Sequence, residues 1–482
     1  MISKTDHIHL KNKRASRSLR GARVLPTFIL LLLVATDQIR LRYPSQPILL
    51  SLSPLLVSLL FLPGALKRLR ELPPALVLSC LLFALTTLVG ALVANLEGRG
   101  MQQTVAGAIA YAGFIPAMVG TYFVGRDELA SERFARAATR LLFFCGVVAG
   151  LQQAGVLDPS LSQMLEDTSA TRGVEGLSTR FAYTPGPFRT ASVFSMFLAM
   201  SATVTLVGAR VKQSWSVVLA ILVATLASIL AARRAGFLML LAVVAPYLFV
   251  FAQTRVMKRL LATVFMATFV FVFLGGEFLS SDQELEAKLL HSTTRTGFAG
   301  RMAQVVQVSS EDWALLEPLG HGIGYVGVSA NAGGPDVRRQ AQLMSAAHPI
   351  LHFGWFSDLV TFGIVGYPLR LAAFFLLLVA VWPRRENYPS SRFAGLVGGC
   401  LLTVSLAVYF FVATSWLHGV SGGLLFGAAI GLCSGCRDRK SLTSTPASTR
   451  EYQREAFHRR VRRKPVKPPS TRPRNAWQLD PK

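Results

Sequence analysis

Long apolar runs alternate with short polar intervals along almost the whole chain. Except for the first, which is short, each run is close to the roughly 20 residues that an α-helix needs to cross the hydrocarbon of a bilayer. The tenth run would begin earlier if the preceding HFGW segment is also embedded. The pattern predicts twelve membrane spans, which begin near Val24, Pro47, Pro74, Met101, Thr139, Thr190, Ser214, Gly236, Arg259, Ile364, Phe393 and Leu417.

One polar interval is much longer than the others. It extends from about Ser280 to His352 and leads into the sequence HFGWFSDLVTFGIVGYPL. Irregular backbone is costly in hydrocarbon because its amide groups find no water there. We therefore expect this segment to lie at the interface or in a protein-lined cavity, where a membrane enzyme would keep its chemistry.

Basic residues gather in every second connection between the predicted spans. If Met1 is cytoplasmic, the even-numbered connections are cytoplasmic too, and Lys and Arg are retained on that side of a membrane. We therefore expect both termini inside and the long interval outside. The basic even-numbered connections are residues 67–71, 126–140, 209–212, 254–259 and 384–392.

The composition is that of a membrane protein. Apolar residues make up 52% of 482, a fraction that a soluble chain of this length could not bury without an unusually large core. The net charge of +25 is concentrated in the tails: residues 1–23 hold seven Lys or Arg against one Asp, and residues 437–482 hold fourteen against four acidic residues. We interpret this charge as fixing orientation and attracting anionic lipid, and not as a nucleic-acid surface.

The predicted fold class is an all-α polytopic membrane protein of about twelve transmembrane helices, with a large extracytoplasmic loop between helices 9 and 10. The expected segments are a basic cytoplasmic tail (1–23), spans one to nine (24–279), an extracytoplasmic loop with short helices (280–363), spans ten to twelve (364–436) and a second basic cytoplasmic tail (437–482).

Two local patterns are open to other interpretations. The basic start and short first apolar run could be a signal peptide, but DQIRLRY is no small-residue cleavage site, so we expect an uncleaved first helix. The five cysteines lie in or beside apolar runs, which predicts no disulfide framework. Cys433 and Cys436 form a single CxxC motif, with no second motif to complete a metal site.

Arginines on the predicted outer side are candidate anion ligands. Arg233 and Arg234 lie in a tight turn between two spans, Arg301 lies in the long loop, and Arg189 precedes the sixth span. A guanidinium presents a planar fork of donors suited to phosphate. The alternatives are interfacial snorkelling for the doublet and a solvated surface charge for Arg301.

Two stretches of the long loop have readable patterns. Apolar spacing from Gly300 to Leu316 is compatible with an amphipathic helix at the interface, ended by Glu317 and Pro318. The following GHGIG sequence, residues 320–324, predicts a flexible turn and lacks the context of a dinucleotide-binding fingerprint.

His348 and His352 end the long loop. Their spacing suggests a metal pair on a helix, but Pro349 makes a continuous helix from His348 unfavourable. A neutral imidazole near a membrane cavity can instead accept a proton from a sugar hydroxyl as a general base. A structural histidine is the alternative for each.

Taken together, these elements resemble the O-antigen ligase and O-antigen polymerase (Wzy-type) family. In that family an S-R-[AG] element follows a span, a G-R segment leads to a P-x-G-x-G turn, and a histidine precedes a G-[LI]-x-G turn. Arg233 or Arg234 corresponds to the first element, Arg301 to the second, and His352, by its distance to Gly363, to the third. The sequence departs from the pattern at Ala232, which replaces serine, and at Phe353, which replaces asparagine, so His348 stays the second candidate.

The resemblance implies a membrane glycosyltransferase on the outer face of the bacterial plasma (inner) membrane. It would transfer or polymerise glycans from an undecaprenyl-diphosphate-linked donor to lipid A core or to another glycan repeat. The implied roles are catalysis for His352 or His348 and diphosphate binding for Arg233, Arg234, Arg301 and Arg189, with no cofactor and no metal. Other possibilities are a twelve-span transporter, a purely structural membrane protein and an oligosaccharyltransferase acting on protein.

Overall fold

The computed structural model describes the helical parts of the chain. The described residues are 68–157, 186–188, 191–209, 215–231, 234–251, 308–326, 343–344, 347–382, 389–411 and 420–437. They contain helices, turns and no strand. The chain divides into two units, Met1–Asp438 and Arg439–Lys482, and every described residue belongs to the first.

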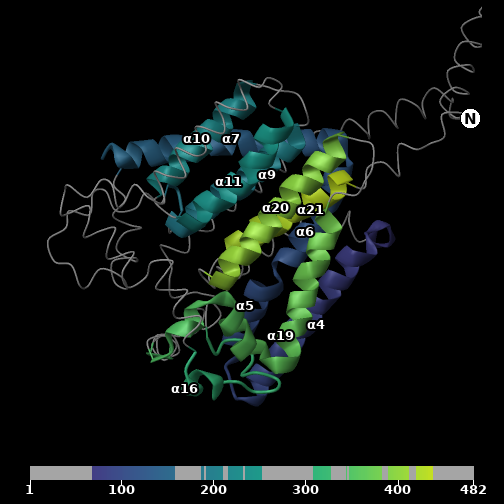
Figure 1. Ribbon diagram of the computed structural model, residues 1–482, viewed down its shortest axis with the longest axis vertical. Helices are drawn as coiled ribbons and strands as arrows, with labels where there is room; N and C mark the ends of the chain where they lie inside the picture. The colour runs from purple at the N-terminus through teal and green to yellow at the C-terminus, as the bar shows by residue number, and fades with distance from the viewer. Residues whose placement is uncertain are drawn as a thin grey trace, which may run out of the picture. The chain divides into compact units, whose positions relative to one another are not determined.

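The helices of the first unit run in long antiparallel and crossing segments (Figure 1). Five stretches are long and apolar enough to cross a membrane: Pro74–Leu96, Met101–Arg126, Leu129–Gln153, Gly354–Val381 and Arg392–Phe410. The long helices are α4 (Pro74–Leu96), α5 (Met101–Ala112), α6 (Phe114–Arg126), α7 (Glu128–Gln153), α9 (Ala191–Ala209), α10 (Trp215–Leu230), α11 (Arg234–Phe251), α19 (Gly354–Val381), α20 (Pro389–Phe411) and α21 (Val420–Arg437). The short ones are η1 (Leu69–Glu71), α16 (Ser310–Trp313) and η3 (Pro349–His352).

Nine of the twelve predicted runs coincide with described helices, and the runs beginning near Val24, Pro47 and Arg259 lie outside the described residues. Two helices begin ten or more residues before their apolar runs. Helix α7 begins at Glu128 because the Asp127 carboxylate caps it, accepting from the amides of Leu129 (2.9 Å) and Ala130 (3.3 Å). Helix α19 begins at Gly354, so the segment after His352 is helical.

Leucines on one side of α4 are exposed although the helix is apolar. They recur at the three- and four-residue spacing that forms a single stripe along a helix. Exposing such an apolar stripe to water is unfavourable, whereas contact with lipid is not. The stripe consists of Leu78, Leu81, Leu85, Leu88 and Leu92, which are 48–60% exposed.

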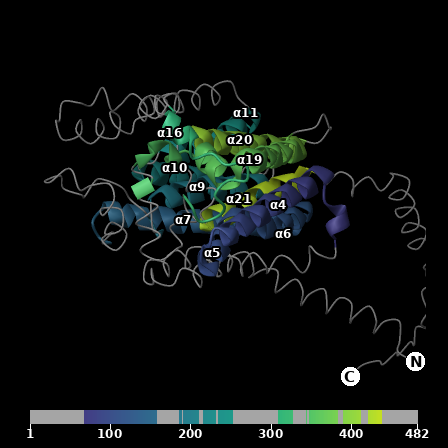
Figure 2. The ribbon, with the colours of Figure 1, turned by 90° about the horizontal axis from the view of Figure 1, so that it is seen from below.

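The opposite side of α4 packs against α19, and both views show the two helices side by side (Figures 1 and 2). Phe83 is fully buried in this interface and meets Phe374 edge to face, with ring centroids 4.8 Å apart. The Ser79 hydroxyl donates to the Ala373 carbonyl oxygen at 2.8 Å. A polar side chain therefore bonds between two otherwise apolar helices, as is common in membranes.

Glycines allow α21 to approach α6 at backbone distance. Gly427, Gly431 and Gly435 recur every four residues and form one face of α21. Small residues at this spacing let membrane helices pack closely, since apolar side chains gain nothing by leaving lipid. A Cβ atom on each would collide with a carbonyl oxygen of α6, namely those of Phe114, Met118 and Tyr122 respectively.

Contacts at the helix ends join connections that are distant in the sequence. Arg126 Nη1 lies 2.7 Å from Glu71 Oε2, which joins the second and fourth predicted connections. Arg437, which ends the last described helix, donates to the Val379 carbonyl at 2.8 Å near the end of α19. The third connection, residues 97–100, instead contacts the long loop at the other end, where α16 also lies (Figure 1).

Candidate functional site

The site is built around a break in α19. Gly363 has φ 72° and ψ 179°, which interrupts the helix in the middle of an apolar segment. In a regular helix the amides of Ile364 and Val365 would donate to the carbonyls of Val360 and Thr361. The break separates these four groups, and unpaired backbone groups are costly away from water.

The long loop provides partners for all four groups. The amides of Ile364 and Val365 donate to the carbonyls of Glu317 (3.3 Å) and Pro318 (3.1 Å). The amides of His321 and Gly322 donate to the carbonyls of Val360 and Thr361, both at 2.9 Å. The loop thus replaces the missing helical hydrogen bonds, and neither the break nor the loop is satisfied without the other.

The glycines of this loop are required by close backbone contact. Gly320, Gly322 and Gly324 have φ of 71°, 77° and 94°, values that favour glycine. A Cβ on Gly322 would lie 2.5 Å from the Ala94 amide nitrogen. The predicted flexible turn is therefore wrong in one respect: residues 320–324 do form a turn, but backbone hydrogen bonds fix it against α4 and α19.

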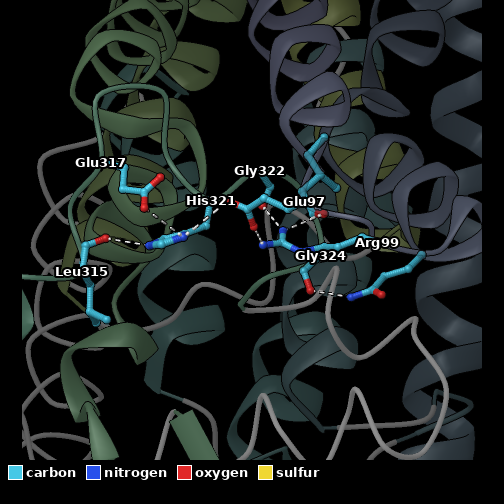
Figure 3. Close-up of polar contacts among 9 residues, drawn as sticks. Glu97, Arg99, Leu315, Glu317, His321, Gly322 and Gly324 are labelled. Atoms are coloured by element: carbon cyan, nitrogen blue, oxygen red, sulfur yellow. Dashed lines mark hydrogen bonds and ion pairs between the residues drawn. The ribbon is translucent and has the colours of Figure 1, made fainter. Parts of the chain in front are cut away.

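Arg99 and Gln103 hold the other side of the loop, and Figure 3 shows Arg99 beside Gly322 and Gly324. Arg99 Nη1 donates to the carbonyls of Gly322 (2.9 Å) and Ile323 (3.2 Å), and Gln103 Nε2 donates to the Gly324 carbonyl (2.6 Å). The guanidinium lies over the Tyr325 ring, 5.0 Å from its centroid. Burial lowers the pKa of Arg99, an effect opposed by the neighbouring Glu97 carboxylate.

His321 lies between the loop and the end of α4. Its Nε2 is 3.0 Å from the Leu315 carbonyl oxygen, and its Nδ1 faces carboxylate oxygens of Glu97 (3.6 Å) and Glu317 (3.8 Å). Its ring stacks on Tyr325 with centroids 4.2 Å apart. Figure 3 shows Glu317 and Glu97 converging on the imidazole from opposite sides.

His348 forms the second polar centre, together with Asp312. His348 precedes η3, in which Pro349 is the first residue, so the expected absence of a continuous helix from His348 is confirmed. Its Nδ1 lies 2.8 Å from Asp312 Oδ1. A carboxylate accepts only, so Nδ1 carries the proton and Nε2 keeps its lone pair. This is the orientation that a general base needs.

Asp312 is itself fixed by a capping box. Its Oδ2 accepts from the Ser309 amide (2.9 Å) and hydroxyl (2.8 Å), and the Asp312 amide donates back to the Ser309 hydroxyl (3.1 Å). Burial acts to raise the pKa of Asp312, but the hydrogen bonds from Ser309 and His348 outweigh it, so this pKa is below its usual value. The carboxylate therefore stays ionised beside His348.

The capping box also corrects the predicted helix from Gly300 to Leu316. Ser309 is extended (φ −75°, ψ 161°), so no helix runs continuously through it, and α16 covers only Ser310–Trp313. Residues 301–307 lie outside the described part of the chain. The serine cap set where the helix begins, and the buried residue of α16 is Asp312, whereas Trp313 of the apolar spacing is 51% exposed.

A buried ion pair lies further along α19. Arg370 Nε is 3.2 Å from Asp358 Oδ2, and both side chains are at most 1% exposed. Arg370 Nη1 also donates to the Thr86 hydroxyl at 3.4 Å. The guanidinium lies within 5.2 Å of the ring centroids of three aromatic side chains, Phe83, Tyr111 and Phe362.

Among the six candidate catalytic and diphosphate-binding residues that the sequence predicts, only His348 is described with its side chain. The backbone of His352 lies in η3, and Arg234 is the first residue of α11, but neither side chain is among those described. Arg189, Arg233 and Arg301 lie outside the described residues. Their convergence on one cavity stays a prediction.

Sequence reasoning missed Asp312 as the partner of His348 and missed Glu97, Glu317 and His321 as a cluster. The pattern of Ser309 followed three residues later by Asp312 is a detectable cap signal. Nothing local connects Asp312 with a histidine 36 residues away. Comparison with family models, curated proteins and solved structures finds no match to this chain.

Proposed function

We propose that the protein is a membrane glycosyltransferase of the O-antigen ligase or polysaccharide polymerase type. It would take glycans from an undecaprenyl-diphosphate-linked donor on the outer face of the bacterial plasma membrane. The observation that carries the proposal is the 2.8 Å contact between His348 Nδ1 and Asp312 Oδ1 in the long loop. It supports a general base in the segment whose motifs resemble that family.

The pair of His348 and Asp312, which we call the dyad, changes which histidine we favour as the general base. The spacing to Gly363 favours His352, but His348 has an ionised partner that sets its tautomer and ring orientation. Its side chain is 17% exposed, so the ring is held without being sealed from a substrate. We therefore assign the base to His348, with His352 as the competing candidate.

In the proposed reaction, His348 Nε2 accepts the proton of an acceptor hydroxyl while the hydroxyl oxygen bonds to the anomeric carbon of the donor glycan. The bond from that carbon to the diphosphate oxygen breaks, and its electron pair leaves with undecaprenyl diphosphate. Arg233 or Arg234, with Arg301 and Arg189, would stabilise the charge on the leaving group. No residue in this scheme requires a metal ion.

The test is glycan synthesis in cells that depend on this chain. His348→Ala and Asp312→Asn should reduce transfer, with His348→Ala losing about two to four orders of magnitude in rate. Glu311→Gln is the matched control, because Glu311 is the exposed neighbour of Asp312 on the same short helix. Full glycan from a normally expressed His348→Ala protein would sink the assignment to His348, and full glycan from both His348→Ala and His352→Ala would sink the mechanism.

A twelve-span transporter is the second candidate, and one observation favours it. Ionisable residues buried among membrane helices often mark transport pathways, and Asp358 with Arg370 is such a pair. The two functions differ in where the lipid-linked glycan accumulates when the protein is absent. An outer-face transferase leaves it accessible to an impermeant lectin on spheroplasts, whereas a transporter of that intermediate leaves it protected until lysis.

A further inference from the structure

The cluster of His321, Glu97 and Glu317 lies apart from the His348 dyad and plays no part in the proposed transfer. One ligand atom of each residue lies within 4.8 Å of the other two. The residues come from two distant parts of the chain, the end of α4 and the glycine-containing loop (Figure 3). We propose that these three side chains bind a divalent metal ion, Mn²⁺ or Zn²⁺, which fastens the loop to α4.

The tautomer of His321 points to a ligand. Its Nε2 faces the Leu315 carbonyl at 3.0 Å, and a carbonyl can only accept, so Nε2 carries the proton. In the neutral imidazole, the Nδ1 lone pair is then directed at two carboxylates, and a cation between them would offset the repulsion. A histidine that binds a metal through one nitrogen usually donates its other N–H to a carbonyl or carboxylate, as His321 does here.

The distances fit a shared ion better than a shared proton. Nδ1 is 3.6 Å and 3.8 Å from the nearest carboxylate oxygens of Glu97 and Glu317, longer than an N–H···O hydrogen bond of about 2.7–3.2 Å. Two ligands that each bind one ion at about 2.1 Å lie about 3.0–3.6 Å apart. Small side-chain movements would complete the coordination.

Glu97 is oriented for this role by Arg99. Its Oε2 pairs with Arg99 Nη2, while Oε1 is the atom that faces His321. The same arginine binds the carbonyls of Gly322 and Ile323, so the carboxylate and the loop share one anchor. A ligating carboxylate is typically held in this way by an outer hydrogen bond.

The ligand set indicates the class of ion. One imidazole and two carboxylates suit Mn²⁺ or Zn²⁺, because carboxylates are preferred ligands of Mn²⁺ and imidazole is a preferred ligand of Zn²⁺. Glu317 is 53% exposed and Glu97 33%, so water can reach the cluster and complete the coordination shell. The ion would join the third predicted connection to the long loop and favour the docked loop over an undocked one.

The experiment is Mn²⁺ titration of tag-free, chelator-treated protein in detergent, followed by the electron paramagnetic resonance signal of unbound Mn²⁺. Manganese is chosen because it binds the cysteine thiols of this chain weakly. We expect one Mn²⁺ per chain for the wild type and for Glu311→Gln, which removes an exposed carboxylate of the same loop. Glu317→Gln and His321→Gln should bind at least tenfold more weakly.

Thermal unfolding gives a second measurement that does not depend on activity. Mn²⁺ should raise the melting temperature of the wild type and of Glu311→Gln but not that of Glu317→Gln, a half-exposed position where substitution is compatible with folding. Wild-type affinity in Glu317→Gln, or only weak binding shared equally by all variants, would overturn the proposal. A wild type that binds no Mn²⁺ in this titration and no Zn²⁺ in equilibrium dialysis would also overturn the proposal, and would mean that a proton on His321 balances the carboxylates.

Discussion

Gly320 and Gly363 cross at backbone contact: a Cβ atom built on either would collide with the amide nitrogen of the other. One glycine lies in the long loop and the other at the break of α19. Both have positive φ, 71° and 72°. The two conditions together explain why this crossing needs glycine on both sides.

Gly363→Ala should destabilise the protein more than a positive-φ substitution alone. Gly98→Ala is the matched control, because Gly98 has φ 73° and nothing within 4 Å of its Cβ position. The control should lose about 1–2 kcal/mol, the cost of the left-handed conformation for alanine. Gly363→Ala should lose clearly more stability than this, which thermal unfolding in detergent measures. Equal losses of stability in the two variants would contradict the close backbone contact between Gly320 and Gly363.

Gly431→Ala should weaken the packing of α21 on α6. The new methyl group would meet the Met118 carbonyl oxygen, which is backbone and cannot rotate away. We expect a loss of about 1–3 kcal/mol or more from overpacking. Gly150→Ala in α7 has open space at its Cβ position and should be neutral or stabilising, since alanine favours helix.

Arg370→Met should be strongly destabilising because it leaves Asp358 buried without this partner. Removing one member of a buried ion pair costs about 3–5 kcal/mol, whereas replacing both by apolar residues costs much less. The double variant Asp358→Leu with Arg370→Met should therefore recover stability relative to Arg370→Met. Yield and melting temperature in detergent measure this, and additive losses would argue against a coupled pair.

Asp312→Asn should remove a stabilising interaction that depends on pH. The pKa of Asp312 is lower in the folded protein than its usual value of about 3.9, so its carboxylate stabilises the fold above that value and loses this effect as pH falls through the folded pKa. The melting temperatures of wild type and Asp312→Asn should differ at neutral pH and converge below about pH 4. A difference in melting temperature that does not change with pH would mean that Asp312→Asn acts through packing and not through the charge of the carboxylate.

Cysteine labelling can test the predicted sidedness. Glu311→Cys lies on exposed α16, near the connection that the charge pattern places outside, and Leu69→Cys lies at the opposite end of α4 in η1. We expect an impermeant thiol reagent to reach the first in intact spheroplasts and the second only after lysis. The reverse result would invert the proposed orientation.

Prediction from sequence succeeded where the signal was local. Runs such as Pro74–Leu96 are apolar enough to mark a helix by composition alone, and Pro349 by itself excluded a continuous helix between His348 and His352. It failed where two distant segments meet. The GHGIG turn could not be distinguished from a flexible one, because its hydrogen-bond partners lie about 40 residues later, in α19, and more than 220 residues earlier, at Arg99 and Gln103.

The amino-acid sequence alone determined that the chain forms apolar helices of membrane length, and local capping by Asp127 and Ser309 set where α7 and the short helix α16 begin. These properties depend on the hydropathy and hydrogen bonding of neighbouring residues. Only the tertiary structure decided that the loop repairs the break in α19, that Asp312 orients His348 and that Glu97 faces His321. Lipid is as apolar as the helix interior, so hydropathy does not reveal which faces pack together, and the polar pairs that form there depend on that packing.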